Sequence, residues 1–422
     1  MTFQKKYAIL SPMNKKLSVG VAISLIAIAC TVTFVVTWTV SFNMYNDMIP
    51  VASRDEINSK LQEIDAYVRN NYLFFDEIAE ERVSFGIFSG YISGLGDKNT
   101  VYMTAEEHIN LQNVEKGQLV TCGIKAEKEG ADYIKVIEVY PGSSAEMFGV
   151  LRDDIITFID SRAVLEMGQD TAIRFLEGEE NTRVDVTIRR EGEDMTHTLV
   201  RQAIEIASIE SAMVDSVGFV RVLAFSALTP SRFDAALQEF SSAGVRALVI
   251  DVRANSSDFY DCVQSMVNRL IGANTVAHTE HRGGRRQDFI STDDSRMLDE
   301  SLPIVVLTDS ATNGAGELVA AVLKSYGNAQ LVGTVTAGNS YKQQTQGLRD
   351  NTAIRVTTAK IVLTSGLDYA NVGLVPDYIV ETSGEFHYDL EYLANLENLE
   401  DITDLQIVKA FDIINTITTN IN

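Results

Sequence analysis

The longest apolar stretch of the chain lies near its N-terminus, where no charged residue occurs between Leu17 and Phe42. A run of this length can cross a bilayer as a single helix. Four lysines precede it, and no acidic residue occurs before Asp47. Because basic flanks stay in the cytoplasm, the pattern predicts a cytoplasmic tail (1–16), a single-pass transmembrane anchor (17–42) and an extracytoplasmic remainder at the cell membrane. The alternative, a cleaved signal peptide, would have a shorter apolar core that ends in small residues.

Helical periodicity dominates the next segment, residues 53–112. Apolar residues recur there at three- and four-residue steps, and a second apolar run covers residues 78–95. We therefore expect a helical lead-in. Residues 404–414 show an amphipathic pattern, which predicts a closing helix within a C-terminal helical tail over residues 385–422.

Residues 116–206 change to a β pattern. Short apolar runs at residues 133–139, 154–159 and 183–189 are separated by turn signals such as Pro-Gly and Glu-Gly pairs. This spacing predicts a small, mostly β domain inserted after the helical lead-in.

Residues 207–384 alternate between strand-like and helix-like runs. The expected strands cover residues 217–223, 247–252 and 303–307, and the expected helices cover residues 231–241, 258–270 and the segment after Gly316. The alternation predicts an α/β core with a mostly parallel sheet and crossover helices. Ligand sites in such sheets lie at the carboxyl ends of the strands, which is where residues 251–258 and 309–317 fall.

Composition narrows the range of partners and cofactors. The 422 residues carry a formal net charge of −23, which argues against a nucleic-acid partner, because phosphate binding depends on Lys and Arg. The three cysteines, Cys30, Cys122 and Cys262, show no CxxC spacing. We therefore expect no metal site, no cofactor and no disulfide framework.

The β segment, residues 116–206, resembles a PDZ domain. The resemblance rests on Cys122-Gly123-Ile124, on the VYPGSSA run that begins at Val139, and on the later strand-like runs. In that family the loop at Cys122, Gly123 and Ile124 offers backbone N–H groups to a peptide's terminal carboxylate, and the peptide adds a strand to the sheet edge. The resemblance thus implies peptide binding at these three residues. The alternative is that Gly123 only permits a turn and the domain is a spacer.

Taken together, residues 55–414 resemble the carboxyl-terminal processing, or tail-specific, serine proteases. The most specific motifs are LVIDVR from Leu248, GELVAA from Gly316 and TAKIVLTSG from Thr358, in that order. In that family a serine is the nucleophile, a lysine in a glycine-flanked turn removes its proton, and a glutamine four residues later orients the pair. A serine hydroxyl needs such a base, and a lysine serves only when burial lowers its pKa.

The resemblance assigns each catalytic position to a residue of this chain. Counting back three residues from Glu317 places the serine position at Gly314. Counting forward through the later glycines places the lysine position at Asn339 and the glutamine position at Gln343. Gly314 has no hydroxyl, and the Asn339 amide is not a useful base at neutral pH.

A third part of the family site is also altered. The turn that helps to stabilise the oxyanion in the family reads Ser256-Ser257-Asp258 after Asn255, and the Asp258 carboxylate would oppose a developing negative charge. The resemblance with these departures predicts a catalytically inactive member that binds peptide or protein C-terminal tails as a scaffold or regulator. Its partners could include an active protease or another membrane protein.

Two alternatives stay open at this point. An active peptidase could use a rearranged pair drawn from Ser310, Thr312, Ser340 and Lys342, although their ordinary roles are turn capping and solvation. A purely structural ectodomain would have neither activity nor peptide affinity. A Ser-His-Asp site is not indicated, because His278 and His281 fall in a polar segment that we predict to be a surface loop.

Overall fold

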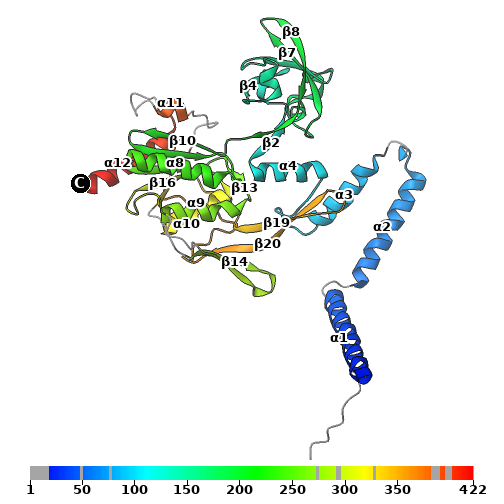
Figure 1. Ribbon diagram of the computed structural model, residues 1–422. Coiled ribbons are helices and arrows are strands. Elements are labelled where there is room, and N and C mark those ends of the chain that lie inside the picture. Colours follow the sequence, from blue (N-terminus) through cyan, green and yellow to red (C-terminus); the bar gives the residue numbers. More distant parts are fainter. Residues whose placement is uncertain are drawn as a thin grey trace, which may run out of the picture. The chain divides into compact units, whose positions relative to one another are not determined.

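The computed structural model describes residues 19–47, 51–75, 78–271, 275–290, 296–326, 329–381, 390–394 and 402–421. The predicted cytoplasmic tail lies outside these residues, as do parts of the predicted C-terminal tail. The chain divides into two compact units, Met1–Ser84 and Phe85–Asn422, and each is described by itself (Figure 1).

The first unit is helical. It contains α1 (Val19–Asp47) and α2 (Val51–Asn71), while α3 (Glu80–Ser93) begins in it and continues into the second unit. Threonine hydroxyls on α1 donate to carbonyls four residues earlier. In the part of the chain that the structure describes, no helix is both long enough and apolar enough to cross a bilayer. The predicted transmembrane anchor over residues 17–42 is therefore not supported.

The second unit contains a small antiparallel β domain. Its strands are β3 (Ile124–Glu129), β4 (Tyr133–Val139), β5 (Ile155–Ile159), β6 (Arg162–Ala163), β7 (Arg183–Arg190) and β8 (Glu193–Val200), with short helices α5 (Ser144–Met147), α6 (Val164–Met167) and α7 (Gln169–Phe175). A further antiparallel pair, β2 (Gln118–Thr121) and β9 (Gln202–Glu205), lies where the chain enters and leaves. Alternate residues such as Val184, Val186 and Ile188 are buried, as expected of strands with one face toward a core.

The central sheet of the core has six strands. These are, in spatial order, β10 (Ile209–Val214), β11 (Val217–Val222), β12 (Ala247–Asp251), β16 (Ile304–Thr308), β18 (Ala329–Gly333) and β21 (Tyr378–Ile379). The β10–β11 pair is antiparallel, and the other four pairs are parallel. The carboxyl ends of β12 and β16 therefore reach the same edge of the sheet.

Helices cover both faces of this sheet, so β12 and β16 are buried along their full length. The helices are α8 (Thr229–Ala243), α9 (Val263–Ile271), α10 (Ala315–Tyr326), α11 (Leu390–Ala394) and α12 (Leu405–Ile421). Ile250 and Val306 belong to the cluster that includes α8, α9 and α10, whereas Val249 and Val305 belong to the cluster that includes α12. Burial on both faces explains why these strands read as continuous apolar runs.

A second sheet of the core is antiparallel in all its described pairs. Its strands are β1 (Val101–Met103), β14 (Thr275–His281), β15 (Arg286–Ile290), β19 (Tyr341–Gly347) and β20 (Ala353–Leu363), and β20 pairs with β1, β14 and β19. Figure 1 shows β14, β19 and β20 side by side below the central sheet.

This second sheet corrects three expectations. The prediction of a mostly parallel sheet describes the central sheet and not the core as a whole. His278 and His281 lie on β14 and not in a surface loop, and β1, from the segment predicted to be wholly helical, pairs with β20. The physical reason is the same in each case: these strands are specified by partners far away in the sequence, which local periodicity does not reveal.

The segment between β12 and α9 also differs from the predicted helix over residues 258–270. It first forms β13 (Ser256–Ser257) and then the short 3-10 helix η2 (Tyr260–Cys262) before α9 begins at Val263. β13 pairs in parallel with β17 (Asn313–Gly314), directly before α10.

Helix α4 (Ala105–Lys116) begins at a capping box formed by Thr104 and Glu107.

Candidate active site

The turn between β16 and β17 is held by a single aspartate. The Asp309 carboxylate accepts hydrogen bonds from the Ala311 N–H (3.1 Å) and the Thr312 N–H (2.7 Å), and the Thr312 hydroxyl lies 2.9 Å from it. That hydroxyl also lies 3.1 Å from the Val252 carbonyl oxygen and is buried. The Thr312 side chain thus stabilises the turn rather than facing a ligand.

Gly314, at the position of the family nucleophile, is buried with a φ of +61°. The β13–β17 pairing places it opposite Ser257. A Cβ atom added to Gly314 would lie 2.3 Å from the Ser257 carbonyl oxygen and 3.1 Å from Asp258 Oδ1. The space into which a serine at this position would project is therefore closed by the main chain.

One buried carboxylate ties the two turns of the site together. Glu317 on α10 is fully buried, and its Oε2 atom accepts hydrogen bonds from the N–H groups of Gly314 (3.1 Å) and Asn339 (2.8 Å). Its Oε1 atom accepts from the Thr336 hydroxyl (2.5 Å) and the Gly338 N–H (2.6 Å). The structure thus brings positions 314 and 339 together through a shared acceptor, using main-chain groups that do not depend on the side chains present there.

Asn339, at the position of the family lysine, uses its side-chain amide fully. Its Nδ2 atom donates to Asn313 Oδ1 (2.9 Å) and Asp258 Oδ1 (3.3 Å), and its Oδ1 atom accepts from the Tyr341 N–H (3.2 Å) and Asn99 Nδ2 (3.3 Å). Asn99 lies 240 residues earlier in the chain, and no sequence motif marked it. The site therefore holds a satisfied neutral amide where the family has a base.

Asp258 carries negative charge into the region of the family oxyanion site. Its carboxylate lies 3.3 Å from Arg355 Nη1 on β20. Burial raises the pKa of the Asp258 carboxyl, while the Arg355 guanidinium and the Asn339 amide act in the opposite direction. Ser256 and Ser257, the other two oxyanion-equivalent residues, form β13. A carboxylate here would raise the energy of an oxyanion.

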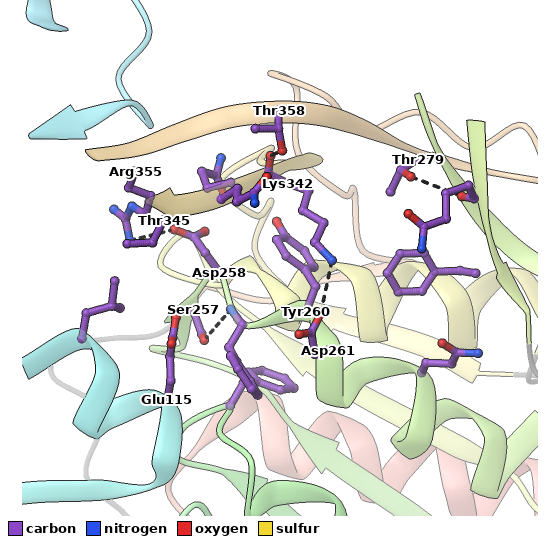
Figure 2. Close-up of a pocket in the computed structure, with 18 of the residues that line it drawn as sticks. Glu115, Ser257, Asp258, Tyr260, Asp261, Thr279, Lys342, Thr345, Arg355 and Thr358 are labelled. Carbon is purple, nitrogen blue, oxygen red and sulfur yellow. Dashed lines mark hydrogen bonds and ion pairs between the residues drawn. The ribbon is translucent and has the colours of Figure 1, made fainter. Parts of the chain in front are cut away.

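A cavity of about 750 Å³ adjoins these groups. It lies between α4, the β13–η2 segment and the second sheet, and Figure 2 shows Asp258, Tyr260, Lys342 and Arg355 around it. Gln343 on β19 lines it, is only 8% exposed, and neither amide atom has a hydrogen-bond partner among the described residues. The position of the family's orienting glutamine is thus occupied by a glutamine that forms no side-chain hydrogen bond with a described residue.

The candidate substitutes for the missing pair do not meet. The Ser340 hydroxyl is buried, and the described residues offer it no hydrogen-bond partner. Lys342 instead forms an ion pair with Asp261 (3.2 Å) and lies over the Phe289 ring, and Ser310 is exposed. None of the candidate hydroxyls is hydrogen-bonded to the Lys342 amine within the described structure, so the geometry gives a rearranged serine–lysine pair no support.

The loop predicted to bind a peptide carboxylate is buried and internally bonded. The Cys122 N–H donates to the Leu176 carbonyl (3.0 Å) and the Gly123 N–H to the Thr121 hydroxyl (3.3 Å). Burial raises the pKa of the Cys122 thiol to about 11, and Cys122, Gly123 and Ile124 are all buried. A carboxylate can bind to these two N–H groups only by replacing the bonds they already make.

Metal ligands do not gather at this site or at another described one. Among the residues that the structure describes, no group of three or more His, Cys, Asp or Glu side chains could hold a metal ion. The described cysteines are free thiols, and both Cys122 and Cys262 are buried.

Both the core and the small β domain of this chain are similar to known proteins. The sequence profile of peptidase family S41 matches residues 216–380, which include Gly314 and Asn339, and that of the PDZ domain matches residues 135–190. The carboxy-terminal-processing protease of Bartonella bacilliformis is 26% identical over 322 residues, which cover 74% of this chain and 73% of the relative.

A probable CtpA-like serine protease of Staphylococcus saprophyticus is 22% identical over 369 residues, covering 87% of this chain and 74% of the relative. Among solved structures, the photosystem II D1 C-terminal processing protease aligns with 23% identity and a TM-score of 0.45, covering 70% of this chain and 81% of that one.

Proposed function

Because the chain belongs to the family of carboxyl-terminal processing peptidases, we propose that it is a catalytically silent member that binds unstructured peptide or protein tails as a scaffold or regulator. The PDZ and peptidase domains both fit the binding of peptide tails. Binding of a peptide tail needs only the shape and polarity of these domains. Cleavage of a peptide bond also needs an activated nucleophile.

The observation that carries the proposal is the closed position at Gly314. A nucleophilic serine needs a Cβ atom and a free approach to the scissile carbonyl, and here a Cβ would collide with the Ser257 carbonyl oxygen at 2.3 Å. Asn339 supplies no base, and Asp258 places a carboxylate near the oxyanion region. Three separate requirements of acyl transfer are thus unmet together.

Cleavage is tested with the full-length chain and an unfolded substrate such as β-casein. We expect no cleavage and no labelling by a fluorophosphonate, which reacts with activated serines. The double variant Gly314→Ser, Asn339→Lys serves as a companion, and we expect it to stay silent because the β13–β17 pairing leaves no room for the new side chain.

The opposite outcome is equally specific. Cleavage by the unaltered chain that disappears in Thr312→Val, Ser340→Ala or Lys342→Met would replace the proposal with an active peptidase that uses a rearranged pair. Cleavage that survives all three changes would point to a contaminating protease, which a size-exclusion profile of the activity identifies.

Peptide binding is tested by amide hydrogen exchange with and without an unstructured peptide. We expect protection along the edge strand β3 of the PDZ domain or around the cavity beside Gln343. Absence of protection at both places for every peptide tried would leave only a structural role for the chain.

An extracytoplasmic location is also part of the proposal and rests only on the charge and apolar pattern of the N-terminal residues. Protease treatment of intact cells tests it, since a chain outside the cytoplasm is degraded and a cytoplasmic one is protected.

A further inference from the structure

The cavity beside Gln343 contains polar groups that the protein itself leaves unsatisfied. The Gln343 side chain is more than nine-tenths buried, yet neither its Oε1 nor its Nε2 atom has a partner among the described residues. A buried amide without hydrogen bonds destabilises the fold, because it has lost its bonds to water without replacing them. Since no lysine occupies position 339, this amide is not needed to orient a base, and a bound ligand could satisfy it.

The amide of Gln343 offers one acceptor and one donor side by side. A peptide bond presents the complementary N–H and C=O groups. The cavity volume of about 750 Å³ is within the range that holds ligands of several residues or a drug-sized molecule. A short stretch of extended peptide therefore fits both the size of the cavity and the unsatisfied amide.

The charges that line the cavity select among peptides. The lining contains four carboxylates and three Lys or Arg side chains, namely Glu115, Asp258, Asp261 and Asp288 with Arg285, Lys342 and Arg355. Two of the carboxylates are already paired within the lining, Asp258 with Arg355 (3.3 Å) and Asp261 with Lys342 (3.2 Å).

Two lining carboxylates, Asp288 and Glu115, stay outside these pairs; Asp288 is exposed, whereas Glu115 is half-buried. Glu115 lies on the last turn of α4, and its side chain forms no hydrogen bond or ion pair with a described residue. Figure 2 shows it on the same side of the cavity as Asp258 and Arg355. Burial, reinforced by the Asp261 carboxylate, raises the pKa of Glu115, although Arg355 and His108 act in the opposite direction. Glu115 is thus a partly desolvated carboxylate whose charge its neighbours do not fully compensate.

We propose that the cavity binds an extended peptide segment that carries a lysine or arginine side chain, with the Glu115 carboxylate receiving the cation and the Gln343 amide bonding to the peptide backbone. The inference rests on the proposed function, since it names the class of peptide that a silent tail-binding member takes at this place. An acidic or apolar segment would leave Glu115 unpaired, and an acidic one would also be repelled by its charge.

The test uses the full-length chain and three unstructured peptides of equal length that differ only in a central lysine, glutamine or glutamate. Binding is measured by fluorescence anisotropy at low and at physiological salt. We expect the lysine peptide to bind about tenfold more tightly than the glutamine peptide, the glutamate peptide to bind most weakly, and the preference to shrink as salt screens it.

Glu115→Gln removes the charge and keeps the shape, so it should abolish the preference for the lysine peptide. Its matched control is Glu106→Gln, an exposed glutamate on the same helix outside the cavity, which changes the net charge equally and should retain the preference. Gln343→Met, of similar volume, should weaken all three peptides alike without lowering Tm, because the amide it removes has no hydrogen bond to lose. A merely structural role for Gln343 would lower Tm instead.

Each contrary result has a distinct meaning. Equal affinity for the three peptides, or a preference that survives Glu115→Gln, overturns the inference while the chain still binds peptides as proposed. Binding of none of the three overturns the inference together with the peptide-binding part of the proposed function. Cleavage of the bound peptide would contradict the proposed lack of catalysis. The charge preference would still be decided by comparing the affinities of the three peptides.

Discussion

Two glycines, one in the turn before α10 and one in the loop of the PDZ domain, adopt similar left-handed conformations for different reasons. Gly314 has a φ of +61° and Gly123 a φ of +101°. A Cβ atom at Gly314 would meet the Ser257 carbonyl oxygen at 2.3 Å, whereas one at Gly123 would meet the Ser143 side chain at 2.1 Å. The obstacle is main chain in the first case and a side chain in the second.

The comparison shows that a glycine can agree with a family motif at one position and depart from it at another. Gly123 lies in the loop that resembles the carboxylate-binding loop of PDZ domains, and its positive φ permits the turn there. Glycine at position 314 stands where the family needs a nucleophile, and the backbone has closed around it through the β13–β17 pairing. In the loop the glycine agrees with the motif, and in the turn it leaves the nucleophile position without a hydroxyl.

The largest expected effect is the loss of stability in Gly314→Ala. The new Cβ atom can be accommodated only by separating β13 from β17, and the left-handed backbone adds strain, so we expect destabilisation by about 3 kcal/mol or more. The measurement is thermal unfolding by calorimetry.

The matched control is Gly142→Ala, which has a φ of +73° but open space around the added atom. Here only the backbone strain applies, about 1 kcal/mol. Equal losses in the two variants would show that the Ser257 carbonyl yields easily, and the distinction between a main-chain and a side-chain obstacle would then fail.

The next effect concerns Gly123→Ala, for which we expect destabilisation by about 2 kcal/mol. Because the obstacle is the Ser143 side chain, adding Ser143→Gly should recover part of the loss. The recovery is incomplete because the Ser143 hydroxyl also caps α5 by accepting the Glu146 N–H at 3.2 Å. A double-mutant cycle should give a coupling energy of about 1 kcal/mol.

The parallel cycle in the core combines Gly314→Ala with Ser257→Gly. Removing the Ser257 side chain leaves its carbonyl in place, so we expect no rescue. A recovery as large as that in the loop would contradict the assignment of the obstacle to the main chain.

The smallest expected effect is electrostatic. Burial raises the pKa of Asp258 in the folded chain above its ordinary value of 3.8, so the ionised carboxylate is disfavoured by folding at neutral pH and the penalty is absent once both states are protonated. Asp258→Asn should therefore raise stability at pH 7 by roughly 0.5 kcal/mol, within the range of partly exposed substitutions. The gain should fade as the pH falls to 3.8 and below.

The loop offers the contrast, because Thr121, Cys122 and Ser143 around Gly123 carry no charge over this pH range. The effect of Gly123→Ala should be the same at pH 4 and pH 7. Two results would contradict this assignment of charge. One is a loss of stability in Gly123→Ala that depends on pH, and the other is a stabilisation by Asp258→Asn that persists at low pH.

Local pattern accounts for much of the central sheet. The runs that form β11, β12 and β16 are mostly apolar and buried, and α8 buries residues at helical spacing, so each of these elements is largely specified by its own residues. The resemblance to the tail-specific proteases also implies a shared site at Gly314 and Asn339, and the structure brings both N–H groups to the Glu317 carboxylate.

The rest depends on contacts between distant segments. Asn99 reaches Asn339 across 240 positions, and Arg355 reaches Asp258 from β20; neither residue lies in a motif. The closure of the turn was equally hidden, because β13 and β17 have only two residues each, too few to show a period. The sequence indicates that the serine and lysine side chains are missing. Only the β13–β17 pairing shows that the space next to Gly314 is closed by the Ser257 carbonyl.

The β13–β17 pairing also bears on which side chains position 314 can accept. In an open turn, a serine side chain at position 314 could project into free space. Here the Cβ atom of a serine at 314 would collide with the Ser257 carbonyl oxygen. A hydroxyl-bearing side chain at this position therefore requires the segment that carries Ser257 to move.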